Sequence, residues 1–242
     1  SAGGTVSGAS PLCLNSSVTL TLSGHTGTVQ RWERRLLPAG TWTNVTNTTT
    51  TYTYTPPSVG TWEFRALVKS GSCSEAYSSV YSVQVDPTSV GGTTSGGNSP
   101  ICINTPTGNI TLSGHTGNIV RWQYRRNSGT WTSIANTTTN LNYTPTNSGT
   151  YDFRAEVRSG SCPSVYSTLT TITVNPASVG GTVNGGTTPI CLGSPTGVMT
   201  LSGHTGTVVR WQRRLGAGAW SDIANTATTY NDTPPSAGTW QY

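Results

Sequence analysis

Five cysteines are the residues best suited to covalent chemistry in this sequence, and their spacing is regular. Cys13 and Cys73 are 60 positions apart (73 − 13), and so are Cys102 and Cys162 (162 − 102). Regular cysteine pairs in a repeated sequence predict one disulfide per repeat, Cys13–Cys73 and Cys102–Cys162. Cys191 then requires a partner near position 251 (191 + 60), beyond this sequence. A bond of this kind stabilises by about 4 kcal/mol in the chain-entropy treatment.

The cysteines also have two alternative interpretations. They can be free buried thiols, or they can bind zinc, although neither CxxC nor HxxxH spacing occurs. The sequence does not show whether Cys13, before the second expected strand, and Cys73, after the sixth, lie at the same end of a domain.

Three histidines occupy the same place in a recurring SGHTG segment, namely His25, His115 and His204. A metal or sugar contact at each turn is one interpretation. No carboxylate or second histidine accompanies them, so a metal site lacks ligands. Ser23 and His25 form a Ser–His pair without an orienting acid, which nucleophilic catalysis requires. We therefore expect turn residues that hydrogen-bond their own loop.

Arginine and tryptophan recur together and are the candidate ligand surface. The residues concerned are Arg31, Arg34, Arg35, Arg121, Arg125, Arg126, Arg210, Arg213 and Arg214, with Trp42, Trp131 and Trp220. Of these, Arg31, Arg35 and the three tryptophans are the best candidates for binding a polyanionic or neutral glycan by charge and stacking. The alternative is a solvated sheet face on which arginine stems cover aromatic rings. The net charge of +5 is too dispersed for a nucleic-acid surface.

Other chemical classes lack the residues they need. Eight acidic residues in 242 leave no cluster of calcium ligands. The single lysine, Lys69, is replaced by Arg158 in the next repeat, so recurring Lys–Asn crosslinks are not supported. There is no nucleotide loop or paired-carboxylate motif, and no apolar run long enough for a membrane span. We expect no catalytic residue, no metal, no cofactor and no membrane insertion.

These residues belong to a module that is written three times. LSGHTGTVQRW at 22–32 returns as LSGHTGNIVRW at 112–122 and LSGHTGTVVRW at 201–211. We set the repeats at 1–88, 89–177 and 178–242, the last one incomplete. The joints VDPTSVGG and VNPASVGG have no long flexible spacer, which predicts closely spaced domains.

Short runs of alternating apolar residues predict an all-β protein. Val18, Leu20 and Leu22 alternate with polar residues, and further strands are expected around 42–45, 52–54, 62–68 and 81–85. About seven short strands per repeat, with turns between them, are typical of an immunoglobulin-like β-sandwich. We therefore expect tandem sandwiches in a linear array. The expected core anchors are Trp32, Trp122, Trp211, Phe64, Phe153 and Tyr151.

The segment NSGTYDFRAEV at 147–157 resembles the Gly-x-Tyr-x-Cys pattern of immunoglobulin domains. Tyr151 matches its corner tyrosine, and Phe153 stands where the second cysteine would be. Leu112 occupies the place of the first cysteine, and Trp122 resembles the core tryptophan of the third strand. In the other repeats the corner residue is a tryptophan, Trp62 or Trp240, which has no phenolic hydroxyl to donate.

The whole repeat also resembles the Ig-like repeats of giant surface proteins from gliding and marine Bacteroidetes. The matching stretches are GGTVSG, PICLG, TLSGHTG, VVRWQ, IANT, TYTPP, FRAEV and SGSC. The resemblance implies export by the type IX system, an extracellular or cell-surface location, and a role in adhesins or surface filaments.

From these observations we expect a structural stalk segment of a large secreted adhesin or filament, which acts by reach rather than catalysis. Its expected partners are neighbouring repeats, surface polysaccharide or other cells, and other chains in a fibre. Three sandwiches in line would form a rod of about 100 Å or more. The alternatives are an array of glycan-binding modules and a non-catalytic appendage of a secreted hydrolase.

Overall fold

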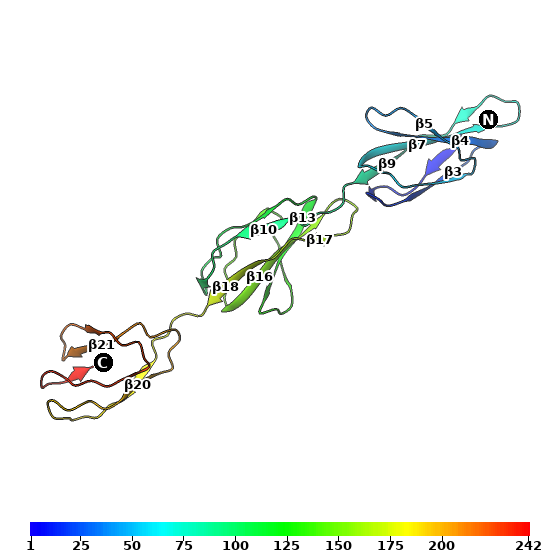
Figure 1. The fold of residues 1–242 in the computed structure, drawn as a ribbon. Helices are drawn as coiled ribbons and strands as arrows, with labels where there is room; N and C mark the ends of the chain where they lie inside the picture. The colour runs from blue at the N-terminus through cyan, green and yellow to red at the C-terminus, as the bar shows by residue number, and fades with distance from the viewer. The chain divides into compact units, whose positions relative to one another are not determined.

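A computed structural model describes all 242 residues, and it is built of β-strands, turns and loops without any helix (Figure 1). The chain divides into two compact units. The first contains Ser1–Ser99, Thr107–Tyr143 and Thr150–Ile172, and the second contains Pro100–Pro106, Thr144–Gly149 and Thr173–Tyr242. The protein contains no helix with the length and hydropathy that a membrane span requires.

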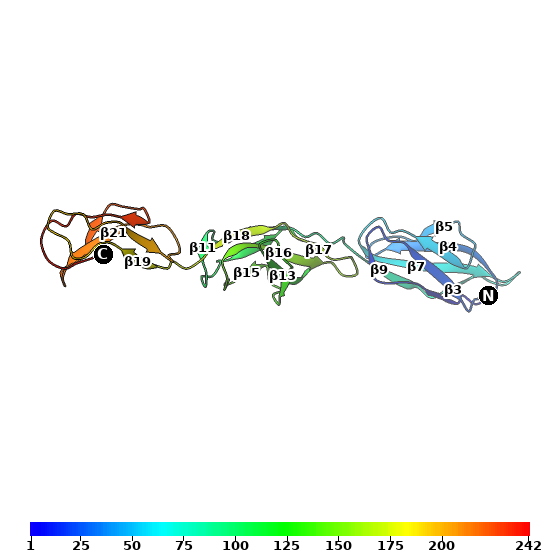
Figure 2. The same ribbon diagram turned by 90° about the horizontal axis from the view of Figure 1, so that it is seen from below.

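The first repeat folds into two sheets, which lie in separate layers (Figure 2). The smaller sheet has the order β1-β3-β6, formed by β1 (Thr5–Ser7), β3 (Val18–Ser23) and β6 (Thr51–Tyr54). The larger sheet has the order β2-β9-β7-β4-β5, and β8 pairs with β7. Its strands are β2 (Leu12–Cys13), β4 (Thr28–Leu36), β5 (Thr43–Val45), β7 (Gly60–Lys69), β8 (Ala76–Tyr77) and β9 (Tyr81–Asp86).

Alternation along the strands directs apolar side chains between the two layers. In β3 the residues Val18, Leu20 and Leu22 are buried while the threonines and serine between them are exposed. Phe64 in β7 and Trp32 in β4 are fully buried against them. The expected strands are present, and β2 and β8 are added to them. Strands of two residues have too little alternation to be recognised in the sequence.

The second repeat has the same two sheets. Its smaller sheet is β10 (Thr93–Gly96), β12 (Ile110–Ser113) and β15 (Asn140–Leu141). Its larger sheet has the order β11-β18-β16-β13-β14 with β17 on β16. These strands are β11 (Ile101–Cys102), β13 (Asn118–Arg126), β14 (Thr132–Ile134), β16 (Gly149–Arg158), β17 (Val165–Tyr166) and β18 (Thr170–Asn175). Trp122, Phe153 and Tyr151 are buried in this repeat.

The third repeat forms two three-stranded sheets, β19-β20-β23 and β22-β21-β24. Their strands are β19 (Thr182–Gly185), β20 (Met199–Ser202), β21 (Trp211–Leu215), β22 (Ser221–Ile223), β23 (Thr229–Tyr230) and β24 (Trp240–Gln241). Trp211 is again buried. Ile190 and Cys191 form no strand, because the last strand with which their counterparts pair has no equivalent within residues 178–242.

Tryptophan takes over the hydrogen bond of the corner tyrosine. The indole Nε1 of Trp62 donates to the backbone oxygen of Ser58 at 3.1 Å, and that of Trp240 donates to Ser236 at 2.9 Å. Each acceptor lies four residues upstream, so the indole N–H makes the backward contact that a phenol makes in other sandwiches. The loss of the phenolic hydroxyl therefore does not remove the corner bond.

Candidate functional site

The one disulfide bond joins Cys13 in β2 to Cys162 in the loop after β16. Their Cα atoms are 4.8 Å apart although 149 residues separate them in sequence. Cys73, Cys102 and Cys191 are exposed free thiols. The bond thus links the first repeat to the second, and the predicted bonds Cys13–Cys73 and Cys102–Cys162 within repeats are wrong.

Strand β7 explains why the two cysteines of one repeat cannot meet. Cys13 pairs with Asp86 at the end of β9, and the start of β7 at Gly60 pairs with Val85 beside it. Cys73 follows the other end of β7, a strand of ten residues that ends at Lys69. At about 3.3 Å per residue this strand separates the two cysteines by roughly 30 Å. The first two repeats therefore each carry their two cysteines at opposite ends, with β7 or β16 between them.

Asp86, the last residue of β9, fixes the loop that carries Cys162. Its Oδ2 accepts hydrogen bonds from the backbone N of Ser161 at 2.9 Å and from the Ser161 hydroxyl at 3.1 Å. Ser159 adds a third bond, in which its N donates to the Ser89 hydroxyl at 2.9 Å. Hydrogen bonds to a carboxylate are stronger than those between neutral groups. In the sequence, Asp86 stands in the joint VDPTSVGG, where nothing indicates its contact with Ser161.

Gly160 makes the close approach of this loop to Asp86 feasible. It has a φ of +46°, and a Cβ atom there would collide with the Asp86 carboxylate. Gly71 is its equivalent in the first repeat, with a φ of +53° and open space around it. The two glycines share the same backbone cost of substitution and differ in this one contact.

We expect Gly160→Ala to disturb the junction while Gly71→Ala costs only the strain of the left-handed backbone. Gly160→Ala should slow formation of the Cys13–Cys162 bond during oxidative refolding, measured by thiol trapping and peptide mapping. In the Gly71→Ala variant, the Cys13–Cys162 bond should form at the wild-type rate. Equal rates for the two variants would contradict the role of the Asp86 contact.

The candidate arginines are paired within the protein. Arg31 contacts Glu33 at 2.8 Å, its equivalent Arg121 contacts Glu156 at 2.7 Å, and Arg210 contacts Asp222 at 2.9 Å. The carboxylate belongs to β4 in the first repeat, to β16 in the second and to β22 in the third, and these three strands are not counterparts of one another. Arginine thus retains a partner even though the position of the acid changes, which fits a structural use of the charge.

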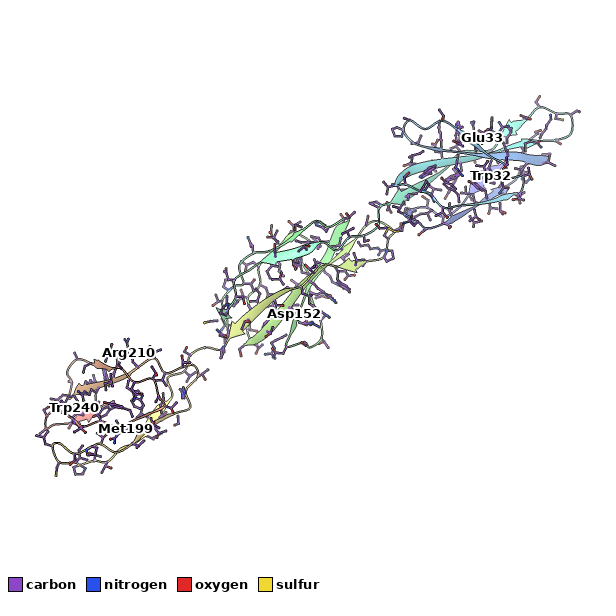
Figure 3. The ribbon with its side chains drawn as sticks, in the orientation of Figure 1. Trp32, Glu33, Asp152, Met199, Arg210 and Trp240 are labelled. Carbon is purple, nitrogen blue, oxygen red and sulfur yellow. A yellow bond between two sulfur atoms is a disulfide. The ribbon has the colours of Figure 1, made fainter.

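Glu33 is the most deeply buried of these acids and lies next to Trp32 in β4 (Figure 3). Burial by itself would raise the pKa of its carboxyl, but hydrogen bonds from Arg65 and Arg31 outweigh this effect and lower the pKa. Tyr77 also donates to it, at 3.2 Å. All of these contacts satisfy the acid, so it is not poised to exchange a proton near neutral pH.

The candidate tryptophans are covered by arginine. The guanidinium carbons of Arg35 and Arg65 lie 4.5 and 4.1 Å from the ring centroid of Trp42. Arg125 and Arg154 stand over Trp131 in the same way, at 4.8 and 3.8 Å. In the third repeat Arg214 lies 4.6 Å from the ring of Trp220. These cation–π contacts occupy the ring faces that a sugar would stack on.

The three histidines lie partly buried in their turns and are not grouped with other ligands. A backbone bridge from Ala2 to Thr26 closes the first turn, and equivalent bridges close the other two. Nδ1 of His25 and of His204 is buried without a hydrogen-bond partner. No group of three or more His, Cys, Asp or Glu residues that could hold a metal occurs in the protein.

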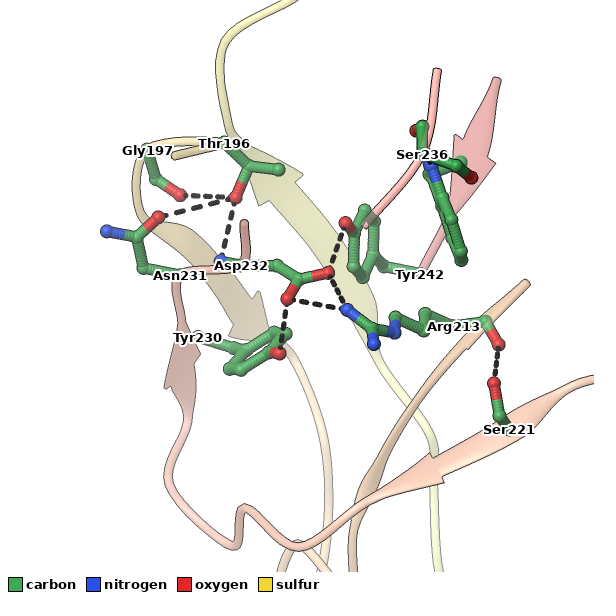
Figure 4. Close-up of polar contacts among 10 residues, drawn as sticks. Thr196, Gly197, Arg213, Ser221, Tyr230, Asn231, Asp232, Ser236 and Tyr242 are labelled. Carbon is green, nitrogen blue, oxygen red and sulfur yellow. Dashed lines mark hydrogen bonds and ion pairs between the residues drawn. The ribbon is translucent and has the colours of Figure 1, made fainter. Parts of the chain in front are cut away.

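Asp232 is the centre of a polar cluster in the third repeat (Figure 4). Its two carboxylate oxygens accept bonds from Arg213 at 2.8 and 2.7 Å, from Tyr230 at 2.8 Å and from Tyr242 at 2.7 Å. Burial by itself would raise the pKa of Asp232, but the hydrogen bonds from Tyr242, Arg213 and Tyr230 outweigh burial and lower it. A carboxylate held by three donors is a structural anchor rather than a base.

We expect this cluster to make stability depend on pH. A carboxyl whose pKa is lower in the folded state contributes its full stabilisation at neutral pH and loses it as the pH falls through that lowered value. Asp232→Asn should therefore lower the unfolding temperature more at pH 7 than at pH 2.5, as measured by calorimetry. A loss of the same size at both values would show that the negative charge does not matter.

A recurring asparagine positions the loop that meets the core tryptophan, and sequence reasoning missed it. Trp122 Nε1 donates to the backbone oxygen of Thr138 at 2.9 Å, and the N of Thr138 donates to the Asn136 side chain at 2.7 Å. The same arrangement joins Trp32, Thr49 and Asn47 in the first repeat. The recurrence of Asn-x-Thr or Asn-x-Ala at these positions was the available signal.

The first two repeats match a known sequence family. A family described as "Domain of unknown function (DUF8696)" matches residues 2–87 and again residues 90–176. Among proteins of curated function, none matches this sequence.

Three solved structures illustrate the likeness. A marsupial T cell receptor has a TM-score of 0.50 and 11% identity, covering 90% of each chain. The FN1–FN3 domains of chicken CNTN1 have a TM-score of 0.35 and 12% identity, covering 98% of this chain and 90% of that one. Fibronectin(III)-like modules of Clostridium thermocellum CbhA have a TM-score of 0.34 and 13% identity, covering 70% and 93%. At 11% identity the likeness to the T cell receptor concerns the fold alone, that of immunoglobulin-like β-sandwiches in tandem.

Proposed function

Because the chain belongs to the DUF8696 family, whose function is unknown, we propose a function from the structure: it is a structural segment that holds consecutive sandwiches together outside the cell. The disulfide from Cys13 to Cys162 is the observation that carries this proposal. A covalent bond between two neighbouring repeats serves the connection between them and not a site within either one.

The immunoglobulin-like fold fits a non-catalytic structural or binding module. The residue types that catalysis would use are engaged in structure. Glu33 and Asp232 are held by arginine and tyrosine. The histidines lie in turns and belong to no group of three His, Cys, Asp or Glu residues. This engagement supports a non-catalytic role, which a structural segment and a non-catalytic appendage of a secreted hydrolase share.

Disulfides are typical of proteins that function in oxidising surroundings, which supports an extracellular location. Within that class, the resemblance of the repeats to those of Bacteroidetes surface proteins favours a large secreted adhesin or filament exported by the type IX system. The function in such a protein would be reach: each added repeat increases the distance that the chain can span.

The glycan-binding alternative has less support. The rings of Trp42 and Trp131 are each covered by two arginines, and those arginines also bond to Glu63, Glu33, Asp152 and Gln123. A sugar that stacked on either ring would have to displace a guanidinium from both an aromatic face and a hydrogen-bond partner. The cost of this displacement favours the spacer function.

Small-angle scattering of the oxidised chain tests the proposal. A spacer should show a maximum dimension on the order of 100 Å or more, estimated from three sandwiches with strands of five to six residues. A compact particle with the repeats folded on one another would contradict reach. Binding on a glycan array that Trp131→Ala abolishes would favour the binding module, and turnover of a polysaccharide or peptide by this chain would contradict a non-catalytic role.

A further inference from the structure

The three free thiols occupy the same positions in their repeats as the two bonded cysteines. Cys102 and Cys191 are counterparts of Cys13, each 89 positions after the one before it (102 − 13 and 191 − 102). Cys73 is the counterpart of Cys162, also 89 positions earlier (162 − 73). The first two repeats thus each contain a first cysteine and a loop cysteine, and residues 178–242 contain only a first cysteine, Cys191. The observed bond joins a first cysteine to the loop cysteine of the next repeat.

The backbone around the free first cysteine Cys102 matches that around the bonded one. Cys13 pairs with Asp86 in a parallel register, and Cys102 pairs with Asn175 in the same register. The residue after each cysteine donates to the same partner, Leu14 to Asp86 at 2.9 Å and the counterpart to Asn175 at 3.0 Å. This half of the junction is therefore already formed, with its thiol exposed, where no second half is present.

The loop half is also formed before any bond is made. In the free loop, Cys73 N donates to Ser70 O at 2.9 Å, and in the bonded loop Cys162 N donates to Ser159 O at 2.8 Å. Both loops turn at a glycine with positive φ. Since the free and bonded forms of each half share their geometry, bond formation requires contact between neighbours and no refolding.

We propose that disulfides run in a staggered series along the protein, from the first cysteine of each repeat to the loop cysteine of the repeat that follows. Where a complete repeat follows, Cys102 or Cys191 bonds to its loop cysteine, and where a repeat precedes the first one, Cys73 bonds to its first cysteine. In each step two thiols lose two protons and two electrons and form one S–S bond, while a disulfide oxidant such as oxidised glutathione is reduced to two thiols.

Bonds within a repeat are excluded by the same geometry that separates Cys13 from Cys73, because strand β7 or β16 lies between the two ends. A bond to a second copy of the chain would need no particular order of repeats. The proposal assigns the partner to the same chain, because the Cys13–Cys162 bond and the Asp86 contact with Ser161 both join the first repeat to the next repeat of the same chain. It does not rest on the spacer function, and either can fail alone.

Completion of the third repeat tests the pairing of Cys102. Tyr242 stands at the position of Phe153 (242 − 89), so a copy of residues 154–176 appended after it supplies the missing loop and strands. An open cleft of about 610 Å³ is bordered by Ile190, Cys191 and Trp240. The added strand should pair beside Ile190 and Cys191, as β9 pairs with Leu12 and Cys13. After refolding with oxidised and reduced glutathione, non-reducing peptide mapping should join Cys102 to the appended copy of Cys162 in a monomer.

Thiol counting distinguishes the outcomes. The unmodified chain has three free thiols, and the extended chain should have two, Cys73 and Cys191. Cys102→Ser in the extended chain should leave three. A bond from the appended cysteine to Cys191, a bond formed only between two chains, or a free appended cysteine in folded protein would each overturn the proposal.

A second variant does not depend on completing the third repeat. A copy of residues 89–177 placed before Ser1 adds a whole preceding repeat in register with the existing joints. Here Cys73 should bond to the copy of Cys102, while Cys13–Cys162 remains intact. The proposal predicts that the Cys73 thiol reacts with a trapping reagent in the unmodified chain and no longer reacts once the repeat is added. The reverse result, a Cys73 thiol that is protected in the unmodified chain and reactive in this variant, would also contradict the proposal.

Discussion

Replacement of Cys13 by serine is expected to lower the free energy of unfolding of the oxidised protein by up to about 5 kcal/mol, the value that the chain-entropy treatment gives for a loop of this length. The bond closes a loop across 149 residues, so its removal returns a large amount of conformational freedom to the unfolded chain. Guanidinium unfolding followed by tryptophan fluorescence under non-reducing conditions measures the change.

Cys73→Ser is the matched control, because Cys73 stands in the same loop position as Cys162 but is an exposed free thiol. It should unfold like the wild type, whereas Cys162→Ser should behave like Cys13→Ser. Reduction of the wild type with dithiothreitol should bring it to the level of the two junction variants. Equal losses for Cys13→Ser and Cys73→Ser would restore the pairing within one repeat.

Trp122→Ala is expected to cost about 3–5 kcal/mol, as large aromatic deletions in a core do. The side chain is fully buried, and its indole N–H supplies the hydrogen bond to the backbone oxygen of Thr138. The substitution leaves a cavity and also an unpaired carbonyl, so both packing and hydrogen bonding are lost. Urea unfolding of the second repeat, followed by near-ultraviolet circular dichroism, measures it.

Trp131→Ala provides the comparison within the same repeat. Trp131 is half-buried and contacts Arg125 and Arg154 through its ring, so its loss should cost about 1 kcal/mol. If Trp122→Ala costs no more than Trp131→Ala, the ring of Trp122 does not anchor the core.

The sequence predicted strands well where each one buries a single face over several residues. In β3 the alternation of Val18, Leu20 and Leu22 with polar residues is itself the physical requirement for one buried face. The same reasoning cannot find β2, since a strand of two residues depends on the parallel partner β9 and not on its own pattern.

The disulfide shows a different limit. Cysteines paired within a repeat are 60 positions apart, and cysteines paired with the next repeat are 149 apart, which is one period of 89 more. Both spacings recur equally regularly, so the sequence does not decide between the two pairings. The length of β7 decides between them, and that length matters only once the direction of each strand is known. The Asp86 contact was missed for a related reason, since its partner Ser161 belongs to another repeat.

The loop closed by Cys13 and Cys162 also determines how the chain responds to tension applied at its ends. Tension that reaches Cys13 crosses to Cys162 through the sulfur atoms, so the strands from β3 to β16 lie outside the covalent route that is stretched. At roughly 3.5 Å per extended residue, the bond withholds about 500 Å of chain from extension. Even with both sandwiches unfolded, the oxidised tether cannot lengthen by that amount. Cleavage of this one bond by a reductant would remove that limit, so that unfolding under tension could add this length to the chain.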